Sequence, residues 1–150
     1  MTMSVPLFFL LSACCVLSAC PPGWFVGYNS SCYLLHQRSL SWVQASHYCL
    51  SLGGHLARIE SETEKNLIRD ELKHLSGHYW LDGIDDVIES DWRWASTYGK
   101  IEPTFWFPNE PSDTAANEDC METHNDFRGL WNDLDCSSHL FSICEKEFLE

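Results

Sequence analysis

Glu110-Pro-Ser-Asp113, Asn117-Glu-Asp-Cys120 and Trp131-Asn-Asp133 place oxygen-bearing side chains at three points of one long stretch of this chain. They belong to residues 82–135, which hold 14 Asp and Glu but only three Lys and Arg. Carboxylates that an ordered core holds close together repel one another unless a cation lies between them. The core here would come from aromatic residues interleaved with the acids, namely Trp92, Trp94, Phe105, Trp106, Phe107 and Trp131. The pattern predicts a cation site, and the alternative is a set of solvated surface carboxylates.

Calcium is the cation that this donor set favours. Asp85 and Glu89, in a neighbouring predicted loop, add two further carboxylates. Calcium accepts six to eight oxygens in loose arrangements, whereas magnesium demands a stricter octahedron. The sequence contains no EF-hand loop, so the fold must assemble the site from separate segments.

Composition and charge limit the other possibilities. A chain of 150 residues, 45% hydrophobic and 21% charged, predicts one globular domain. The formal charge of −13 argues against a nucleic-acid partner, because phosphate contacts need clustered cations.

The first 19 residues resemble a secretory signal peptide. They carry no charged side chain, and an apolar core of 11 residues, Leu7 to Leu17, ends in small residues. This core is too short to span a bilayer, and no later segment is long and apolar enough. Residues 1–19 are therefore predicted to be the signal and residues 20–150 the secreted, extracellular domain. The alternative is lipidation at Cys20, since Leu17-Ser-Ala-Cys20 fits the bacterial lipoprotein pattern.

Removal of that signal leaves an even number of cysteines bound for an oxidising compartment, which predicts three disulfides. Six cysteines allow 15 pairings, and spacing suggests only that Cys20 and Cys32 close a hairpin and Cys120 and Cys136 close a loop. These cysteines are not expected to bind zinc, because the sequence has no Cys-x-x-Cys pair and no paired histidine spacing. Asn29-Ser-Ser31 is a glycosylation sequon in the predicted hairpin.

Two helices are predicted in the first half. Ser39 or Ser41 caps the first, which ends at Gly53-Gly54. The capping box Ser61-Glu-Thr-Glu64 begins the second, which Gly77 stops. His74 and His78 are interpreted as surface residues because Gly77 separates them.

Short strands follow from Tyr79 onward. Aromatic runs alternate with Gly, Pro, Asn and Asp clusters and predict strands at Tyr79-Trp80-Leu81, Trp92-Arg-Trp94 and Phe141-Ser-Ile143. Between the last two, a long irregular stretch is expected from about Tyr98 to Leu130. A loop of that length is normally functional or held by something other than secondary structure.

Several motifs in the same order resemble the long-form C-type lectin domain, and in particular its small secreted single-domain members. The resemblance covers residues 20–145 and rests on Cys20-Pro-Pro-Gly-Trp24, Cys32-Tyr33, Ala45-Ser-His-Tyr-Cys49, Gly53-Gly-His55 and Trp80-Leu-Asp-Gly83. It implies an α+β fold in which two helices pack on two small antiparallel sheets, with a long calcium-binding loop region. It also implies the disulfides Cys20–Cys32, Cys49–Cys144 and Cys120–Cys136.

The same resemblance implies two calcium sites. The sugar-binding calcium would be held by Glu110, Ser112, Glu118, Asn132 and Asp133, and the auxiliary calcium by Asp85, Glu89, Asp113, Glu118 and Asp119. Pro111 would follow a cis peptide bond. Ser112 departs from the family, which has Asn there in mannose-type lectins and Asp in galactose-type lectins. A serine hydroxyl is too short for us to assume that it reaches both calcium and a sugar hydroxyl.

The implied function is secreted, calcium-dependent binding of glycans with vicinal hydroxyls, including those on microbial surfaces, in innate immune recognition. Retention of Glu110-Pro111 favours mannose, glucose or fucose. The rival is a domain of the same fold that binds protein, mineral or ice without calcium-dependent sugar recognition. An enzyme is not expected: paired carboxylates could serve a glycosidase, but the sequence has no Gly-x-Ser-x-Gly, His-Glu-x-x-His or phosphate-binding glycine-rich loop. No collagen-like or coiled-coil segment is present, so a homo-oligomer would need contacts between domains.

Overall fold

Residues 20–114 and 116–147 are described by the computed structural model. The predicted signal peptide lies outside these residues. In chain order the elements are β1 (Phe25–Val26), β2 (Ser31–Leu40), α1 (Trp42–Ser51), β3 (His55–Leu56), α2 (Glu62–Leu72), β4 (His78–Ile84), β5 (Arg93–Trp94), β6 (Cys120–His124), the 3-10 helix η1 (Asn125–Phe127), β7 (Trp131–Leu134) and β8 (Leu140–Glu147). Across this described part, no helix has the length and apolar character needed to cross a membrane.

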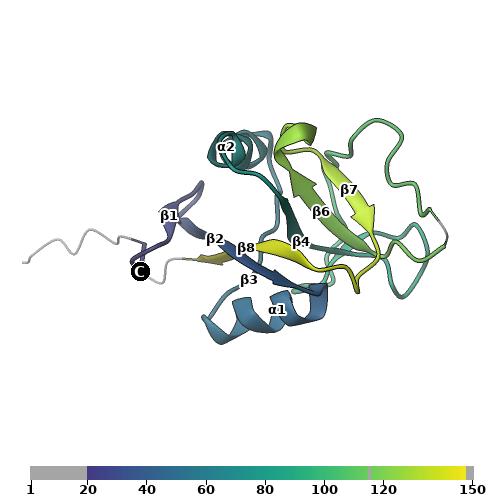
Figure 1. Ribbon diagram of the computed structural model, residues 1–150, viewed down its shortest axis with the longest axis horizontal. Coiled ribbons are helices and arrows are strands. Elements are labelled where there is room, and N and C mark those ends of the chain that lie inside the picture. Colours follow the sequence, from purple (N-terminus) through teal and green to yellow (C-terminus); the bar gives the residue numbers. More distant parts are fainter. Residues whose placement is uncertain (1–19, 115, 148–150) are drawn as a thin grey trace, which may run out of the picture.

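The strands form one mixed sheet in the order β1-β2-β8-β4-β6-β7, with β3 also paired to β8 and β5 to β4. The strand pairs β2·β8, β4·β6 and β6·β7 are antiparallel, as predicted. The pair β4·β8 is parallel, and it joins the β1-β2-β8 part of the sheet to the β4-β6-β7 part. The two expected antiparallel sheets are therefore continuous. In Figure 1 β1 lies at one side of the molecule, and the long loop between β5 and β6 lies at the opposite side, beyond β7.

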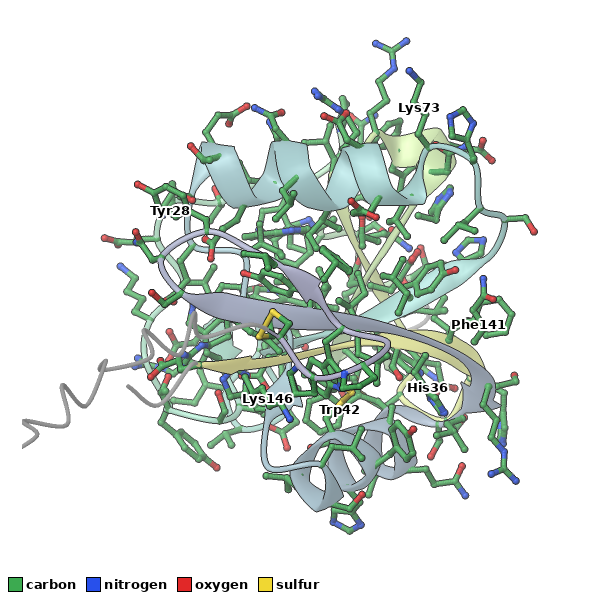
Figure 2. The ribbon with its side chains drawn as sticks, turned by 90° about the vertical axis from the view of Figure 1, so that its left-hand side faces the viewer. Tyr28, His36, Trp42, Lys73, Phe141 and Lys146 are labelled. Atoms are coloured by element: carbon green, nitrogen blue, oxygen red, sulfur yellow. A yellow bond between two sulfur atoms is a disulfide. The ribbon has the colours of Figure 1, made fainter. Side chains whose placement is uncertain are left out.

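The two helices begin where serine side chains satisfy their free backbone N–H groups. Ser41, not Ser39, caps α1 in a full capping box with Gln44. Ser61 caps α2 by accepting from the backbone N–H of Glu64, and the helix ends at Leu72, before Gly77. Figure 2 shows α2 above and α1 below the sheet strands. Each helix therefore covers a different part of the sheet.

Aromatic residues form much of the core. Trp80 and Trp131 are fully buried and Trp94 nearly so, while Trp106 is partly buried against the same cluster. Trp131 meets Trp94, Phe105 and Trp106 edge to face. This packing attaches the long loop to the sheet.

Three disulfides join Cys20 to Cys32, Cys49 to Cys144 and Cys120 to Cys136, which confirms the pairing that the resemblance implied. The alternative of lipidation at Cys20 is wrong in this structure, because its sulfur is paired. Asn29 of the sequon lies exposed in the turn between β1 and β2.

The expectation of irregular structure through Leu130 is wrong for residues 120–124, which form β6. All five of its residues are buried, although Glu122, Thr123 and His124 are polar. The apolar alternation that marks a strand is therefore missing from its sequence. This segment is a strand because its backbone pairs with β4 on one side and with β7 on the other.

Candidate functional site

The long loop between β5 and β6 is held against β7 by backbone hydrogen bonds. Trp131 donates its N–H to the carbonyl of Phe105 (2.9 Å), and its own carbonyl accepts from the N–H of Phe107 (2.8 Å). The Glu110-Pro111 peptide is cis, as the resemblance implied, and Glu102-Pro103 is cis as well. Glu110-Pro-Ser-Asp113 is thereby placed beside the strand that carries Asn132 and Asp133.

Asp133 connects that strand to the loop. Its buried carboxylate accepts hydrogen bonds from the backbone N–H groups of Ser112 (3.1 Å) and Asp113 (2.6 Å). Within the loop, the carboxylate of Glu118 accepts hydrogen bonds from the N–H of Thr114 (2.6 Å) and the hydroxyl of Ser112 (3.4 Å). The structure thus brings Glu118, Ser112 and Asp133 together from three segments.

Glu110 completes this cluster with a buried carboxylate oxygen. Its Oε2 is buried and has no hydrogen-bond partner. Burial raises the pKa of Glu110, and the nearby carboxylates of Asp133 and Glu118 raise it further, against a lowering hydrogen bond from Ser112. An unpartnered carboxylate oxygen beside two other carboxylates is costly without a cation and provides hard ligands for calcium. The residues present therefore fit such an ion.

The side chain of Asn132 is hydrogen-bonded to a residue outside the predicted calcium ligands. Its side-chain amide donates to Oε1 of Glu122 (3.1 Å), the residue opposite it on β6. The amide nitrogen is held by Glu122, which leaves the carbonyl oxygen of Asn132 available as an acceptor. The part of Asn132 in a calcium site stays a prediction, and Glu122, which orients it, was not identified from the sequence.

Asp85, Glu89 and Asp119 form a second acidic group. One oxygen of Asp85 accepts from the N–H of Ser90 (2.9 Å), while the other, Oδ1, is buried without a partner. Burial raises the pKa of Asp85 to about 6; Glu89 and Asp119 add to the shift and the Ser90 bond opposes it. The Asp85 N–H also donates to the Asp119 carbonyl (3.2 Å). The same argument therefore supports a cation here.

Asp113 and Glu118 complete the predicted auxiliary set and are joined to each other. The N–H of Glu118 donates to Oδ1 of Asp113 (3.2 Å). Glu118 thus contacts Ser112 of one predicted set and Asp113 of the other. Its assignment to both calcium ions stays a prediction.

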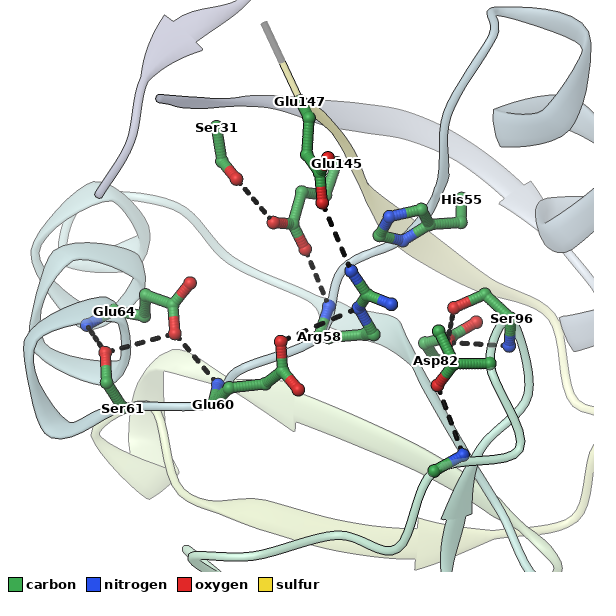
Figure 3. Close-up of polar contacts among 12 residues, drawn as sticks. Ser31, His55, Arg58, Glu60, Ser61, Glu64, Asp82, Ser96, Glu145 and Glu147 are labelled. Atoms are coloured by element: carbon green, nitrogen blue, oxygen red, sulfur yellow. Dashed lines mark hydrogen bonds and ion pairs between the residues drawn. The ribbon is translucent and has the colours of Figure 1, made fainter. Parts of the chain in front are cut away.

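Two further buried carboxylates, Glu145 and Asp82, accept hydrogen bonds from protein donors, and they too were not identified from the sequence (Figure 3). Glu145 accepts from the hydroxyl of Ser31 (2.7 Å) and the N–H of Arg58 (3.0 Å), and burial raises its pKa. Asp82 accepts from the hydroxyl (2.6 Å) and the N–H (3.0 Å) of Ser96. These bonds satisfy the acids with protein donors, whereas Glu110 and Asp85 each keep an unpartnered oxygen.

Residues 38–146 match the family described as the lectin C-type domain. Among curated relatives, the galactose-specific lectin nattectin of Thalassophryne nattereri is 33% identical over 95% of this chain and 98% of its own. The mouse scavenger receptor C-type lectin carbohydrate-recognition domain has a TM-score of 0.78 at 26% identity, with 87% of this chain and 98% of the other covered. A calcium-independent type II antifreeze protein has a TM-score of 0.77 at 28% identity, covering 87% and 96%. The chain therefore belongs to the C-type lectin domain family.

Proposed function

We propose that this protein is a secreted, calcium-dependent lectin that binds glycans carrying vicinal hydroxyls. Its sugar site would consist of Glu110, Ser112, Glu118, Asn132 and Asp133. The observation that carries the proposal is the buried, unpartnered Oε2 of Glu110, whose neighbours are the carboxylates of Glu118 and Asp133. Family members include lectins, which bind and do not catalyse, and we propose no catalytic activity for this chain.

The residues of this site have complementary parts in binding a sugar. A bound calcium ion would offer coordination positions to two vicinal hydroxyls. Glu110 and Glu118 accept hydrogen bonds from those hydroxyls, and the Asn132 amide has a second N–H to donate. Replacing water oxygens with sugar oxygens gains little free energy, so a single sugar is expected to bind with a Kd on the order of 1 mM. Useful avidity then needs several sites, supplied by a homo-oligomer.

Mannose, glucose and fucose are the proposed sugars, because Glu110-Pro111 resembles the mannose-type motif. Nattectin, a relative named for galactose specificity, points the other way. Residue 112 decides between them in our proposal, and the exposed Ser112 matches neither type. Glycans on microbial surfaces, met outside the cell, would present such sugars in many copies.

The test is retention on immobilised mannose and on immobilised galactose. The proposal predicts retention on at least one column in calcium and elution when a chelator removes it. Retention that survives the chelator, or no retention on any glycan of an array, contradicts calcium-dependent sugar binding.

A specificity change should follow from exchanging two loop residues. Glu110→Gln with Ser112→Asp replaces the mannose-type acceptor by an amide and adds a carboxylate at residue 112, as in galactose-type lectins. We expect the ratio of mannose to galactose binding to fall by about tenfold, close to 1.4 kcal/mol. Competitive elution with the two free sugars measures the ratio. An unchanged ratio would show that this loop does not set specificity.

We also propose that Asp85, Glu89, Asp113, Glu118 and Asp119 hold an auxiliary calcium ion. The unpartnered Oδ1 of the buried Asp85 supports this assignment, as Oε2 of Glu110 supports the other.

Acidification should weaken calcium binding at an unusually high pH. The pKa of Asp85 is about 6 and that of Glu110 is raised, and both carboxylates must be ionised to bind calcium. Affinity should therefore fall below about pH 6, by about tenfold at pH 5 from Asp85 alone. Without calcium, acidification should instead stabilise the fold. A carboxylate whose pKa is raised to about 6 destabilises the folded state above pH 6, and its protonation below that pH removes this cost. Calorimetry at pH 7.5 and 5 checks the affinity; equal values contradict the prediction.

The rival function is binding of protein, mineral or ice without calcium-dependent sugar recognition. Two observations favour it: Ser112 departs from both sugar motifs, and the chain is similar to a calcium-independent antifreeze protein. Exposed Val87, Ile88 and Tyr98 offer apolar contact area beside Asp85. Binding that a chelator leaves unchanged would favour this reading.

A further inference from the structure

His78, Glu122 and His124 meet at one place on the sheet. His78 on β4 lies directly opposite His124 on β6, and Glu122 is two residues before His124, so strand alternation puts all three on one face. One ligand atom from each lies within 4.8 Å of the other two. Nδ1 of His78 is 3.2 Å from Oε1 of Glu122, and the two imidazole centroids are 4.2 Å apart.

Glu122 is the unexplained member of this group. Its side chain is only 1% exposed, yet its Oε2 is buried without a hydrogen-bond partner. The other oxygen, Oε1, is used twice, by the amide of Asn132 (3.1 Å) and by His78. A buried carboxylate with one free oxygen costs stability unless something binds that oxygen. The proposed calcium sites do not use it.

We propose that His78, Glu122 and His124 form a binding site for a borderline transition metal ion, with Zn²⁺ the best fit. Two imidazoles and one carboxylate are a donor set that zinc accepts, and calcium prefers oxygen alone. Tetrahedral zinc with bonds near 2.1 Å needs ligand atoms about 3.4 Å apart. Nδ1 of His78 lies 3.2 Å from Oε1 of Glu122, close to this separation. The three ligand atoms lie within 4.8 Å of one another, so binding an ion requires the more distant of them to move closer.

The surroundings of the three side chains hold them in place. The ring of His124 packs at a tilt against Phe127 (centroids 3.7 Å apart, interplanar angle 46°), and its Nδ1 lies 3.9 Å from the carboxylate of Asp126. The amide of Asn132 fixes Glu122 from the opposite side. Partners of this kind orient metal ligands and raise affinity.

Access to the site comes through His78. Its side chain is 49% exposed, whereas those of His124 and Glu122 are 10% and 1% exposed. The protein thus supplies three ligands from one side and leaves the fourth position of a tetrahedral ion open to water or to an external donor.

The test is titration of the disulfide-bonded protein, without a histidine tag, with ZnCl₂ in the presence of excess calcium. We expect one zinc per chain with a Kd of about 1 µM or tighter, and cobalt substitution should give the visible spectrum of a tetrahedral site. Saturating calcium keeps the result independent of the proposed sugar site, so either proposal can fail alone.

Matched variants locate the ion. His124→Gln and His78→Gln should each weaken zinc binding by about 100-fold. His74→Gln, at an exposed histidine in the turn after α2, should leave zinc binding unchanged. Glu122→Gln, which keeps the shape of the side chain, tests the third ligand. Near-UV circular dichroism confirms the fold of each variant. The proposal would be overturned if the unaltered protein does not bind zinc, or if a variant that carries both His78→Gln and His124→Gln binds zinc as tightly as the unaltered protein.

Discussion

Asp133→Asn is expected to abolish calcium-dependent glycan binding while the fold survives. The substitution preserves volume but removes the charge of a carboxylate that is 1% exposed and faces Glu110. A divalent ion loses one ionised ligand, and the loop loses one acceptor for the N–H groups of Ser112 and Asp113. Calcium affinity should fall by about 100-fold, or about 2.7 kcal/mol, and sugar retention with it.

The control for this variant is Asp70→Asn, the same chemical change at an exposed position on α2. Calorimetry with calcium measures the first loss, and a mannose or galactose column measures the second. Combining Asn132→Ala with Asp133→Asn should reduce sugar retention little further, because the single variant has already lost calcium-dependent binding. If Asp133→Asn unfolds the domain, its role is structural; if it binds sugar normally, the proposed site is wrong.

Much of the fold could be predicted because its signals are local. Ser41 and Ser61 mark the starts of the helices, and a serine cap satisfies backbone groups within its own turn. The cysteine count predicts three bridges, although the full pairing came only with the family resemblance. The excess of acidic residues in the long loop could also be recognised in the sequence, and the structure brings Glu110, Ser112, Glu118 and Asp133 close together.

The remainder depends on contacts between distant segments, which local patterns do not contain. Cys120–His124 has no apolar alternation, and it is a strand because β4 and β7 flank it. Its polar residues are tolerated only through partners outside the strand: Glu122 meets His78 and Asn132, which lie 44 and 10 residues away in the chain. His78 and His124 become neighbours through strand register alone, so their sequence positions gave no spacing to recognise.

Trp131→Ala should cause the largest loss of stability among single substitutions near the site. The indole is fully buried, with ring centroids of Trp94, Phe105 and Trp106 at 5.8, 5.2 and 5.6 Å. Truncating it leaves a cavity between the loop and the sheet, and such changes cost about 3–5 kcal/mol. Because Asn132 and Asp133 follow directly in β7, calcium affinity should fall as well.

Urea unfolding measures this cost, and two variants separate its causes. Trp131→Phe retains an aromatic ring and should lose clearly less stability than Trp131→Ala. Trp24→Ala makes the same truncation at a half-buried position, where Lys146 lies 4.4 Å above the ring, and should cost only about 1 kcal/mol. A similar loss for Trp131→Ala and Trp24→Ala would mean that Trp131 does not anchor the loop. A stable Trp131→Ala variant with reduced calcium affinity would show instead that its packing positions Asp133 more than it stabilises the domain.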